Sequence, residues 1–502
     1  MSRISISTAE FASLMKKIPL VKEEPLGVAV SGGVDSMALC YLLSRYCRDY
    51  KHKLTAFIVD HKLRPESTWE ASQVAEVLSK LDVDSKVLQI QWNTREASKF
   101  LPSQTHAFPR TSQMELFARH HLNDQLETMV MRLARGSGIV GLASMETNSK
   151  FPVQRTIGAL NMNVVRPMLK IHKSRIIETC KAANVQWFED STNESDQHKR
   201  NVVRMTLNTI NQRYHGGQKE YEPISTEGLL RFVNHMEHHK RCVNFKVREI
   251  LSRCVQFNSE VGFCVLDLPE SLPRDHWFCQ KHLAIRVITS LVRWVTCAEQ
   301  PPILEPIARC YQHMIQSHTE PDRKSYSTQG MLLCPVIEKK KKHADHRRVF
   351  KKGSKQSWAF YRQPISKSND KLVTNIIKDS EIILWDKRFF IGLELNKDFK
   401  HDDNNNKTYI VRRFKEADFP LVSRRLLKIK NSSSDEWRRY QHYRVRVHAT
   451  ARHNIPIVIR KDEDTESSGL ELLISLPTLG ISLAPDIANV WSKFRGQISE
   501  MT

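Results

Sequence analysis

Two patterns of apolar and polar positions alternate along residues 25–215. Short apolar runs of strand length occupy residues 26–30, 54–60, 86–92, 114–118 and 163–166. Between these runs, apolar residues recur three or four positions apart, which is the spacing of a helix with one buried face. The first such segment contains Leu39, Leu42, Leu43 and Tyr46. This alternation predicts an α/β fold, with a parallel sheet covered by helices on both faces.

One interval breaks this pattern. A crossover between parallel strands normally contains a helix. Residues 93–112, between the third and fourth expected strands, instead carry Pro102 and Pro109 among Ser, Thr, Gln and His. We therefore expect an irregular segment there.

The pattern changes beyond residue 215. Helical spacing continues through residues 226–256 and 280–298, and later apolar runs separated by polar turns predict strands. The chain is therefore expected to hold four parts: an N-terminal tail at 1–24, an α/β domain at 25–215, a helical middle region at 216–325 and an α+β region at 326–502.

Composition narrows the class of protein. The 77 Lys and Arg residues exceed the 55 Asp and Glu residues and give a net charge of +22. This balance excludes an acidic solvating protein and favours a polyanionic partner, with mere solubility or residence in an organelle as the alternative explanation of the charge. No run approaches the roughly 18 apolar residues of a membrane span. The ten cysteines include no CxxC pair, so neither a zinc ribbon nor a disulfide scaffold is expected.

The strongest chemical signal is Ser31-Gly32-Gly33-Val34-Asp35-Ser36, directly after a strand and before a helix. Backbone N–H groups of a glycine turn and of a helix N-terminus bind phosphate oxygens. The hydroxyls of Ser31 and Ser36 add donors, and Asp35 can orient Mg²⁺. The segment ends without the Gly-Lys-Ser/Thr of a Walker A loop and is not a GxGxxG fingerprint.

A second group of reactive side chains follows the fourth strand. Asp124 and Glu127 share a helix face with His121, one turn earlier. Alone, such a carboxylate pair is more often an exposed helix face, but the phosphate loop upstream reverses that preference. Beside a triphosphate, the pair can position Mg²⁺ or deprotonate an attacking amine. Arg200 and Arg204, one turn apart, are candidates for gripping phosphates or substrate, although lone arginines are more often surface residues.

Several motifs carry a resemblance to known families. The loop at residues 31–36 resembles the SGGxDS signature of the PP-loop ATP pyrophosphatases, which split ATP into AMP and pyrophosphate. Residues 58–67 (IVDHKLRPES) and 120–142 resemble the VDHxLRxxS and HHxDDQxET…RGSGxxGL segments of the tRNA(Ile)-lysidine synthases. Three shorter matches to RPLL, EDxxN and RNxxR fall at residues 166–169, 189–193 and 200–204. The resemblance covers about residues 26–205, with weaker likenesses to fungal members at 385–388 and 476–480.

The resemblance implies an ATP-dependent ligase. Such an enzyme adenylates the C2 carbonyl of the wobble cytidine of tRNA(Ile) with a CAU anticodon, and free L-lysine then displaces AMP. ATP and Mg²⁺ would be the cofactors, with Ser31 to Ser36 binding ATP. The carboxylates expected to be catalytic are Asp35, Asp124 and Glu127. Of these, Asp35 and Asp124 are also expected to hold Mg²⁺. The pocket is expected to be lined by His61, Arg64, His121, Arg135, Arg200 and Arg204.

The sequence also departs from this family. Asn123 replaces the first aspartate of the HHxDD pattern. The helix with an ARxxRY-like segment has no clear counterpart between residues 93 and 118, where the crossover helix is also missing. Either a stretch has been lost or the gene model is faulty. A catalytically impaired tRNA-binding relative therefore stays an alternative, as does a PP-loop tRNA thiolase, against which the lack of CxxC pairs counts.

The first 24 residues bear on the compartment. They carry few acids, several serines and the bases Arg3, Lys16 and Lys17, but Glu10 interrupts them. This composition is at most a weak organelle presequence. The expected location is the mitochondrial matrix, with the cytoplasm as the alternative.

Overall fold

The computed structural model describes twelve stretches of the chain: residues 4–20, 24–62, 66–90, 114–152, 162–188, 199–318, 320, 323–336, 356–396, 407–428, 434–462 and 471–496. Two compact units, Met1–Cys242 and Val243–Thr502, divide it. The interval at 93–112 and the residue Arg64 lie outside the described stretches. Across those stretches, no helix is both long enough and apolar enough to cross a bilayer.

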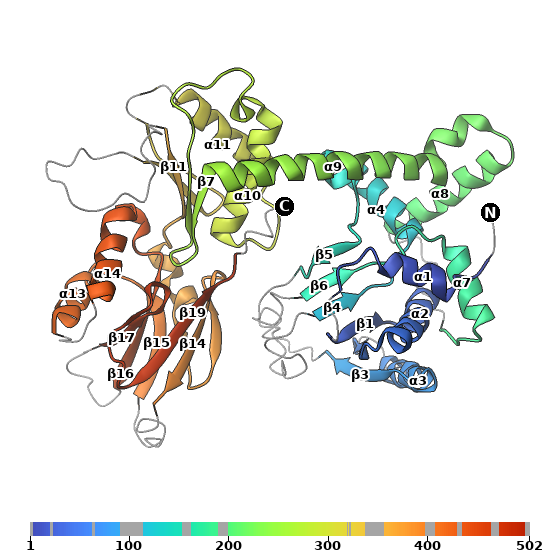
Figure 1. The fold of residues 1–502 in the computed structure, drawn as a ribbon, viewed down its shortest axis with the longest axis horizontal. Helices are drawn as coiled ribbons and strands as arrows, with labels where there is room; N and C mark the ends of the chain where they lie inside the picture. The colour runs from blue at the N-terminus through green and yellow to red at the C-terminus, as the bar shows by residue number, and fades with distance from the viewer. Residues whose placement is uncertain are drawn as a thin grey trace. The chain divides into compact units, whose positions relative to one another are not determined.

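The first unit is built on a six-stranded sheet with the order β3-β2-β1-β4-β6-β5 (Figure 1). Its strands are β1 Leu26–Val30, β2 Leu54–Asp60, β3 Asp84–Gln89, β4 Met114–Phe117, β5 Asn148–Lys150 and β6 Met162–Val165. All neighbouring pairs are parallel except β5 with β6. The predicted α/β class with a largely parallel sheet is thus confirmed, and the antiparallel edge strand β5 is an addition to it.

The helices of this unit follow the strands in the expected alternation. They are α1 Thr8–Met15, α2 Val34–Tyr50, α3 Ser67–Lys80, α4 Leu122–Ala134, α5 Ile139–Leu142, α7 Lys173–Ala182 and α8 Lys199–His215. A short 3₁₀ helix, η3 Lys219–Ile224, leads to the long helix α9 Thr226–Cys254, within which the boundary between the units falls.

One face of the sheet carries most of the core of the first unit. Successive side chains of a strand point to opposite faces. Leu54, Ala56 and Ile58 of β2 therefore join the large core cluster, whereas Phe57 packs with Met162 in a small cluster on the other face.

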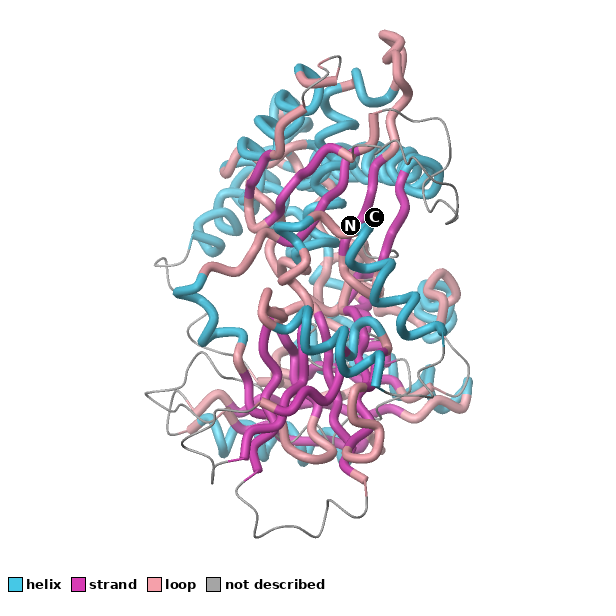
Figure 2. Tube along the Cα trace, turned by 90° about the vertical axis from the view of Figure 1, so that its left-hand side faces the viewer, coloured by secondary structure: helices cyan, strands magenta, loops and turns pink. Residues whose placement is uncertain are grey.

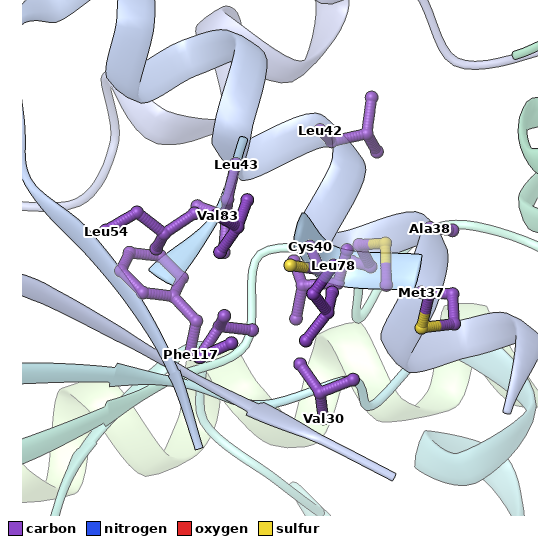
Figure 3. Packing of buried hydrophobic residues seen from close by; sticks show 14 of the residues in the cluster. Val30, Met37, Ala38, Cys40, Leu42, Leu43, Leu54, Leu78, Val83 and Phe117 are labelled. Carbon is purple, nitrogen blue, oxygen red and sulfur yellow. The ribbon is translucent and has the colours of Figure 1, made fainter. Parts of the chain in front are cut away.

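Helix α2 covers the large cluster. Figure 3 shows Met37 and Leu43 of α2 beside Val30, Leu54 and Phe117 of three strands. Each fully buried aliphatic side chain of this kind contributes about 1.5–3 kcal/mol. The buried face of α2 thereby fixes the helix, and with it the loop that precedes the helix.

Helix α1 belongs to the same core. Its side chains Phe11 and Met15 are each 1% exposed. The carboxylate of Glu10 accepts hydrogen bonds from both terminal nitrogens of Arg175 in α7, at 2.9 and 2.6 Å. The part of the chain expected to be a tail thus supplies a helix whose apolar face is buried in the first unit.

The second unit is rich in antiparallel strands, as the sequence predicts for its later part. One sheet has the order β7-β8-β11-β10-β9, with strands Val255–Asn258, Phe263–Leu266, Trp358–Arg362, Met331–Pro335 and Tyr326–Thr328 in that order. A second sheet, β12-β15-β16-β17-β18, comprises Asn375–Ile376, Lys407–Arg413, Pro456–Asp462, Leu472–Leu476 and Ile481–Ser482. A third, β13-β14-β19, comprises Ile382–Trp385, Phe389–Leu395 and Ala488–Phe494. Figure 2 shows strands of these sheets running side by side in magenta.

Four further α-helices complete the described part of the second unit: α10 Lys281–Thr296, α11 Leu304–Gln316, α13 Asp418–Lys428 and α14 Ser434–Arg446. The short 3₁₀ helices are η4 Trp277–Cys279, η5 Lys367–Val373, η6 Ala449–Ala451 and η7 Pro477–Leu479. Helices α10 and α11 share one core cluster with the first of these sheets, and α13 and α14 share another.

The motif at residues 385–388 has a structural explanation. It forms the turn between β13 and β14, where Asp386 and Lys387 have φ values of 46° and 58°. Two consecutive positive φ values suit the tight turn of a hairpin. Arg388 follows with no exposed surface and donates to Asp386 at 2.8 Å.

Candidate active site

Two of the predicted motifs meet at one edge of the sheet. Strand β1 pairs with β2 on one side and with β4 on the other. The chain leaves β1 toward β2, so the carboxyl ends of β1 and β4 form a topological switch point, where ligands of open α/β sheets bind. The loop beginning at Ser31 follows β1, and His121 lies shortly after β4.

The loop at Ser31 to Ser36 is closed by its own hydroxyl groups. The backbone N–H of Ser31 donates to Oγ of Ser36 at 3.2 Å, and that hydroxyl donates to the Gly33 carbonyl at 2.9 Å. Gly32 has a φ of +85°, and a Cβ there would lie 2.6 Å from a methyl carbon of Val74. Gly33 is the N-cap residue of helix α2 and offers no side chain to cap it. The N-terminal turn of α2 is therefore available to an anion.

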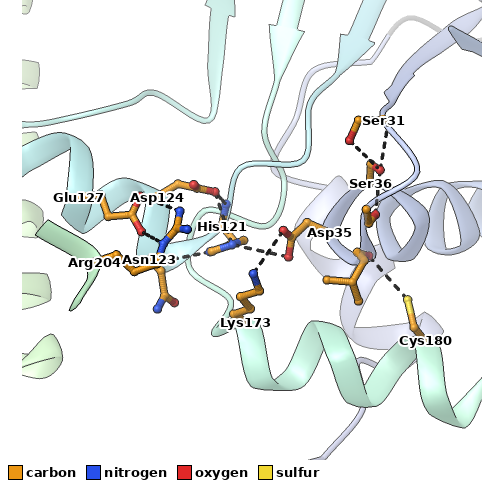
Figure 4. Close-up of polar contacts among 12 residues, drawn as sticks. Ser31, Asp35, Ser36, His121, Asn123, Asp124, Glu127, Lys173, Cys180 and Arg204 are labelled. Atoms are coloured by element: carbon orange, nitrogen blue, oxygen red, sulfur yellow. Dashed lines mark hydrogen bonds and ion pairs between the residues drawn. The ribbon is translucent and has the colours of Figure 1, made fainter. Parts of the chain in front are cut away.

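Asp35 is the buried carboxylate of this loop. It is 8% exposed, and its Oδ1 has no hydrogen-bond partner among the described residues. Two cationic or ionisable groups approach it, Nε2 of His121 at 3.5 Å from Oδ1 and Nζ of Lys173 at 4.0 Å from Oδ2. Figure 4 shows the contacts from both side chains converging on the Asp35 carboxylate.

His121 is held as the N-cap of helix α4. Its Nδ1 accepts a hydrogen bond from the backbone N–H of Asn123 at 3.2 Å, while the backbone N–H of His121 donates to Oδ2 of Asp124 at 3.1 Å. Since Nδ1 is an acceptor, we assign the proton to Nε2, which lies 3.5 Å from both Asp35 and Asp124. Burial lowers the pKa of His121, against the attraction of the two carboxylates.

Two arginines of α8 bind the carboxylate pair of α4. Arg200 donates through Nε to Glu127 at 2.6 Å and through Nη2 to Asp124 at 2.6 Å. Arg204 donates through Nε to the other Glu127 oxygen at 2.7 Å. Glu127 is 1% exposed, so both of its oxygens are enclosed and occupied. The hydrogen bond to Glu127 raises the pKa of Arg204.

The same network keeps Asp124 ionised. Burial alone would raise the pKa of its carboxyl group, but His121 and Arg200 together lower it. Helix α8 is brought here by apolar contact as well, since Leu207 packs with Leu122 and Leu126 of α4. Arg200, Arg204 and Leu207 lie four and three positions apart and therefore share one face of α8.

The donor set fits a magnesium ion only in part. Within the described residues, no three His, Cys, Asp or Glu side chains converge as a ready-made metal site. Asp35 fits the expected role because its Oδ1 is buried and lacks a hydrogen bond. Asp124 fits less well because its two oxygens accept from Arg200 and His121. One carboxylate plus phosphate oxygens is a common environment for Mg²⁺.

The structure separates one of the other predicted pocket residues, Arg135, from this cluster. Arg135 ends helix α4, fourteen positions after His121, which corresponds to about 20 Å along a helix. His61 is described and exposed after β2.

The carboxylate next to His61 has a structural role. Asp60 is 1% exposed and accepts from the hydroxyls of Ser67 and Thr68, each at 2.8 Å. The spacing of Ser67 and Glu70 predicts a capping box at the start of α3. This prediction is wrong, because the Ser67 hydroxyl donates to Asp60 and the N-cap residue of α3 is Glu66, which makes no side-chain capping bond. These hydrogen bonds lower the pKa of Asp60, against the effect of burial.

Two cations near the loop were not singled out by the motifs. Lys173 is the first residue of α7. Arg119 places a guanidinium nitrogen 3.7 Å from where a Cβ on Gly33 would lie. The available signal for Lys173 was its position, because helix N-termini usually carry acids rather than bases.

Comparison with known proteins agrees with the motifs. The PP-loop domain family matches residues 4–210. Over 94% of both chains, the sequence is 27% identical to a protein of Schizosaccharomyces pombe named probable tRNA(Ile)-lysidine synthase.

Two bacterial proteins named tRNA(Ile)-lysidine synthase match a shorter part. One from a Bradyrhizobium species is 34% identical over 41% of this chain and 58% of its own length. One from Rickettsia rickettsii is 32% identical over 36% of this chain and 38% of its own length. Residues 4–210 therefore match a PP-loop domain, and the chain is similar to proteins named tRNA(Ile)-lysidine synthase, in agreement with its motifs.

Proposed function

We propose that this chain is a tRNA(Ile)-lysidine synthase. In the first step, O2 of the wobble cytidine attacks the α-phosphorus of ATP, and the bond to pyrophosphate breaks. In the second, an amine of free L-lysine attacks C2, the C2–O bond breaks, AMP leaves and the nitrogen loses a proton. The products are lysidine in tRNA(Ile), AMP and pyrophosphate.

The observation that supports this proposal best is the convergence of three separate motifs. Asp35 of the phosphate loop, His121 and Asp124 of the HHxDD-like block and Arg200 of the RNxxR-like block form one continuous series of contacts. These residues come from α2, α4 and α8. A phosphate loop joined to ionised carboxylates is suited to activating a carbonyl oxygen and then binding the ammonium group of lysine, which attacks as the neutral amine after it loses a proton.

Each residue of the cluster has a role in this proposal. Ser31 to Ser36 bind the phosphates of ATP, and Asp35 is the residue that would hold Mg²⁺, which neutralises phosphate charge when it is bound. Asp124 stays ionised and attracts the amine. Glu127 has both oxygens bound by arginines, so we assign it to the positioning of Arg200 and Arg204 and not to proton transfer.

A groove in the second unit suits the nucleic acid. It has a volume of about 670 Å³ and lies between strands β7 and β8 and helix α14. Its charged and ionisable lining residues are the basic Arg438, Arg439 and His442 and the acidic Glu260 and Asp435, so the bases outnumber the acids. Together with the net charge of +22, this groove supports a backbone-dominated contact with tRNA. The compartment, mitochondrial matrix or cytoplasm, stays a prediction.

The cysteines argue against a thiolase. All ten are free, and burial raises the pKa of Cys40, Cys47 and Cys180 to about 12. Thiols of this kind are poor nucleophiles because the thiolate is the reactive form. Cys180 instead contacts the Val34 carbonyl at 3.6 Å and links α7 to the phosphate loop.

The test is an incubation of the full chain with ATP, labelled L-lysine and an unmodified tRNA(Ile) transcript. We expect label in the tRNA, together with AMP and pyrophosphate, and no label when the wobble cytidine is replaced by uridine. ATP–pyrophosphate exchange without lysine incorporation would indicate another PP-loop tRNA-modifying enzyme. Binding of tRNA without exchange would indicate an impaired relative.

A further inference from the structure

We propose that Lys173 binds the pyrophosphate portion of ATP and stabilises it as it leaves. The inference rests on the proposed function only in taking the loop at Ser31 to Ser36 as the phosphate site. Lys173 belongs to none of the motifs that define the candidate site, yet its Nζ lies 4.0 Å from Oδ2 of Asp35.

The position of Lys173 is set by the buried side of its helix. Ile176 and Cys180 of α7 have no exposed surface and lie in the large core cluster. Arg175 ties the same helix to α1 through Glu10. The backbone of α7 therefore places Lys173 beside the phosphate loop without help from the lysine side chain.

The lysine side chain itself is only loosely engaged. It is 45% exposed, and its contact with Asp35 is at the outer limit of an ion pair. Such a contact contributes little to stability. Among the described residues, the structure gives Lys173 this one ion pair, with Asp35. The ammonium can therefore turn toward a ligand with little loss of free energy.

The charge arrangement around α7 is unusual for a helix N-terminus. Lys173 occupies the first position, and the first turn contains no acid. The positive end of the helix dipole disfavours a lysine there unless an anion is nearby. Asp35 is a partial answer, but its buried Oδ1 lacks a hydrogen bond. A phosphate chain with bound Mg²⁺ would satisfy Asp35 and Lys173 together. The cation would bind the Asp35 carboxylate, and phosphate oxygens would bind the Lys173 ammonium.

The chemistry of adenylation gives Lys173 a specific partner. When the α-phosphorus of ATP is attacked, the bond to the β-phosphate breaks and pyrophosphate takes the electron pair. The phosphate cradle formed by the loop and the N-terminus of α2 adjoins Lys173 through Asp35. A lysine there, acting as a point charge, favours ligands that carry the pyrophosphate group and has little effect on AMP.

The test compares equilibrium binding of pyrophosphate, a non-hydrolysable ATP analogue and AMP, in excess Mg²⁺, by calorimetry. The variants are Lys173→Met, Lys173→Arg and the control Lys170→Met, which removes the same charge from an exposed position three residues earlier. We expect Lys173→Met to weaken pyrophosphate and analogue binding by about tenfold or more, with AMP binding within about twofold of the original. Lys173→Arg should recover most of the loss, and Lys170→Met should bind all three ligands normally.

Several outcomes would overturn the inference. They are unchanged pyrophosphate binding in Lys173→Met, an equal loss for AMP and pyrophosphate, or an equal effect of Lys170→Met. Thermal unfolding of each variant separates loss of binding from loss of fold. If Lys173→Met loses pyrophosphate binding as expected but the original chain makes no lysidine, the proposed function fails while the role of Lys173 stands. If it makes lysidine and Lys173→Met binds pyrophosphate normally, the reverse holds.

Discussion

Arg200 of helix α8 donates a hydrogen bond to Oδ1 of Asp124 in helix α4 at 2.6 Å, across 76 positions of sequence. The same guanidinium reaches Glu127 through Nε. Arg200 is thus a bridge between two carboxylates, and charge-assisted bonds of this length are among the stronger hydrogen bonds of proteins. The arginines that the sequence suggested for gripping phosphate are already partnered by the acids that it suggested for catalysis.

Glu127 and Arg204 should behave as one structural unit. We expect Glu127→Gln and Arg204→Met each to lower the free energy of unfolding by about 1–3 kcal/mol, less than for a fully buried pair because Arg204 is 37% exposed. The double variant should lose less than the sum, with a coupling of at least about 0.5 kcal/mol. The exposed pair Glu178 and Lys181 is the matched control, with little coupling expected. Strict additivity at Glu127 and Arg204 would contradict the positioning role.

Asp35 should be needed for ATP chemistry and not for folding. Its Oδ1 makes no hydrogen bond among the described residues, so Asp35→Asn should leave the melting temperature within a few degrees. We expect ATP consumption to fall about a hundredfold or more, equivalent to about 2.7 kcal/mol, because the proposed ligand for Mg²⁺ is removed. The measurement is ATP–pyrophosphate exchange beside thermal unfolding. Normal exchange in this variant would remove Asp35 from the site.

Acidification should destabilise the first unit through one buried and two half-buried histidines. Burial lowers the pKa of His120, His121 and His172, so below the ordinary pKa of about 6.5 the unfolded chain binds more protons than the folded one. Stability should therefore fall as the pH drops below 6.5, by up to about 1.4 kcal/mol for each pKa unit of depression.

The histidine contribution can be isolated with His121→Asn. Asparagine is a good N-cap but does not titrate. Unfolding by denaturant at pH 7.5 and pH 5.5 should show a smaller loss in this variant than in the original chain, with the remainder due to the other two histidines. An identical loss in both proteins would show that His121 has an ordinary pKa.

Helix α1 should be retained in the working protein. Phe11→Ala should cost about 3–5 kcal/mol, as for other buried phenylalanines, because Phe11 is 1% exposed. Ile4→Ala, at a position 67% exposed, is the control and should have an effect within about 0.5 kcal/mol. Mass spectrometry of the protein from its own cells should find residues 8–15 present. A stable, active form beginning after Met15 would contradict this.

The groove in the second unit should contribute to tRNA affinity. Arg438→Gln with His442→Gln should weaken tRNA binding and lower the slope of log affinity against log salt by about 0.7–0.9 for each phosphate that the variant no longer neutralises. Arg253→Gln is a suitable control. The side chain of Arg253 is 74% exposed, close to the 75% of Arg438, and it does not line the groove. An unchanged salt slope in the double variant would remove the groove from the tRNA surface.

The local parts of this protein were readable from the sequence. The loop from Ser31 to Ser36 is contiguous, and its strand, turn and helix follow from residues next to one another, so its place after β1 was predictable. The third strand was expected at residues 86–92 and is found at Asp84–Gln89, an error of the size usual at strand ends. The α/β class was also predictable from local sequence, because the spacing of apolar residues within each helix or strand shows which of its faces is buried.

The tertiary structure decided which reactive groups meet. The spacing of Arg200 and Arg204 showed that they share a helix face, but not that this face would meet Asp124 and Glu127. Lys173 could not be recognised as a site residue from the sequence, because its partner Asp35 lies 138 positions earlier in the chain. Arg135 was grouped with the site by motif, yet the length of α4 carries it away from His121. Periodicity specifies which side of an element is buried, whereas the partner on that side depends on sheet order and crossovers, which are long-range packing outcomes that no short segment encodes.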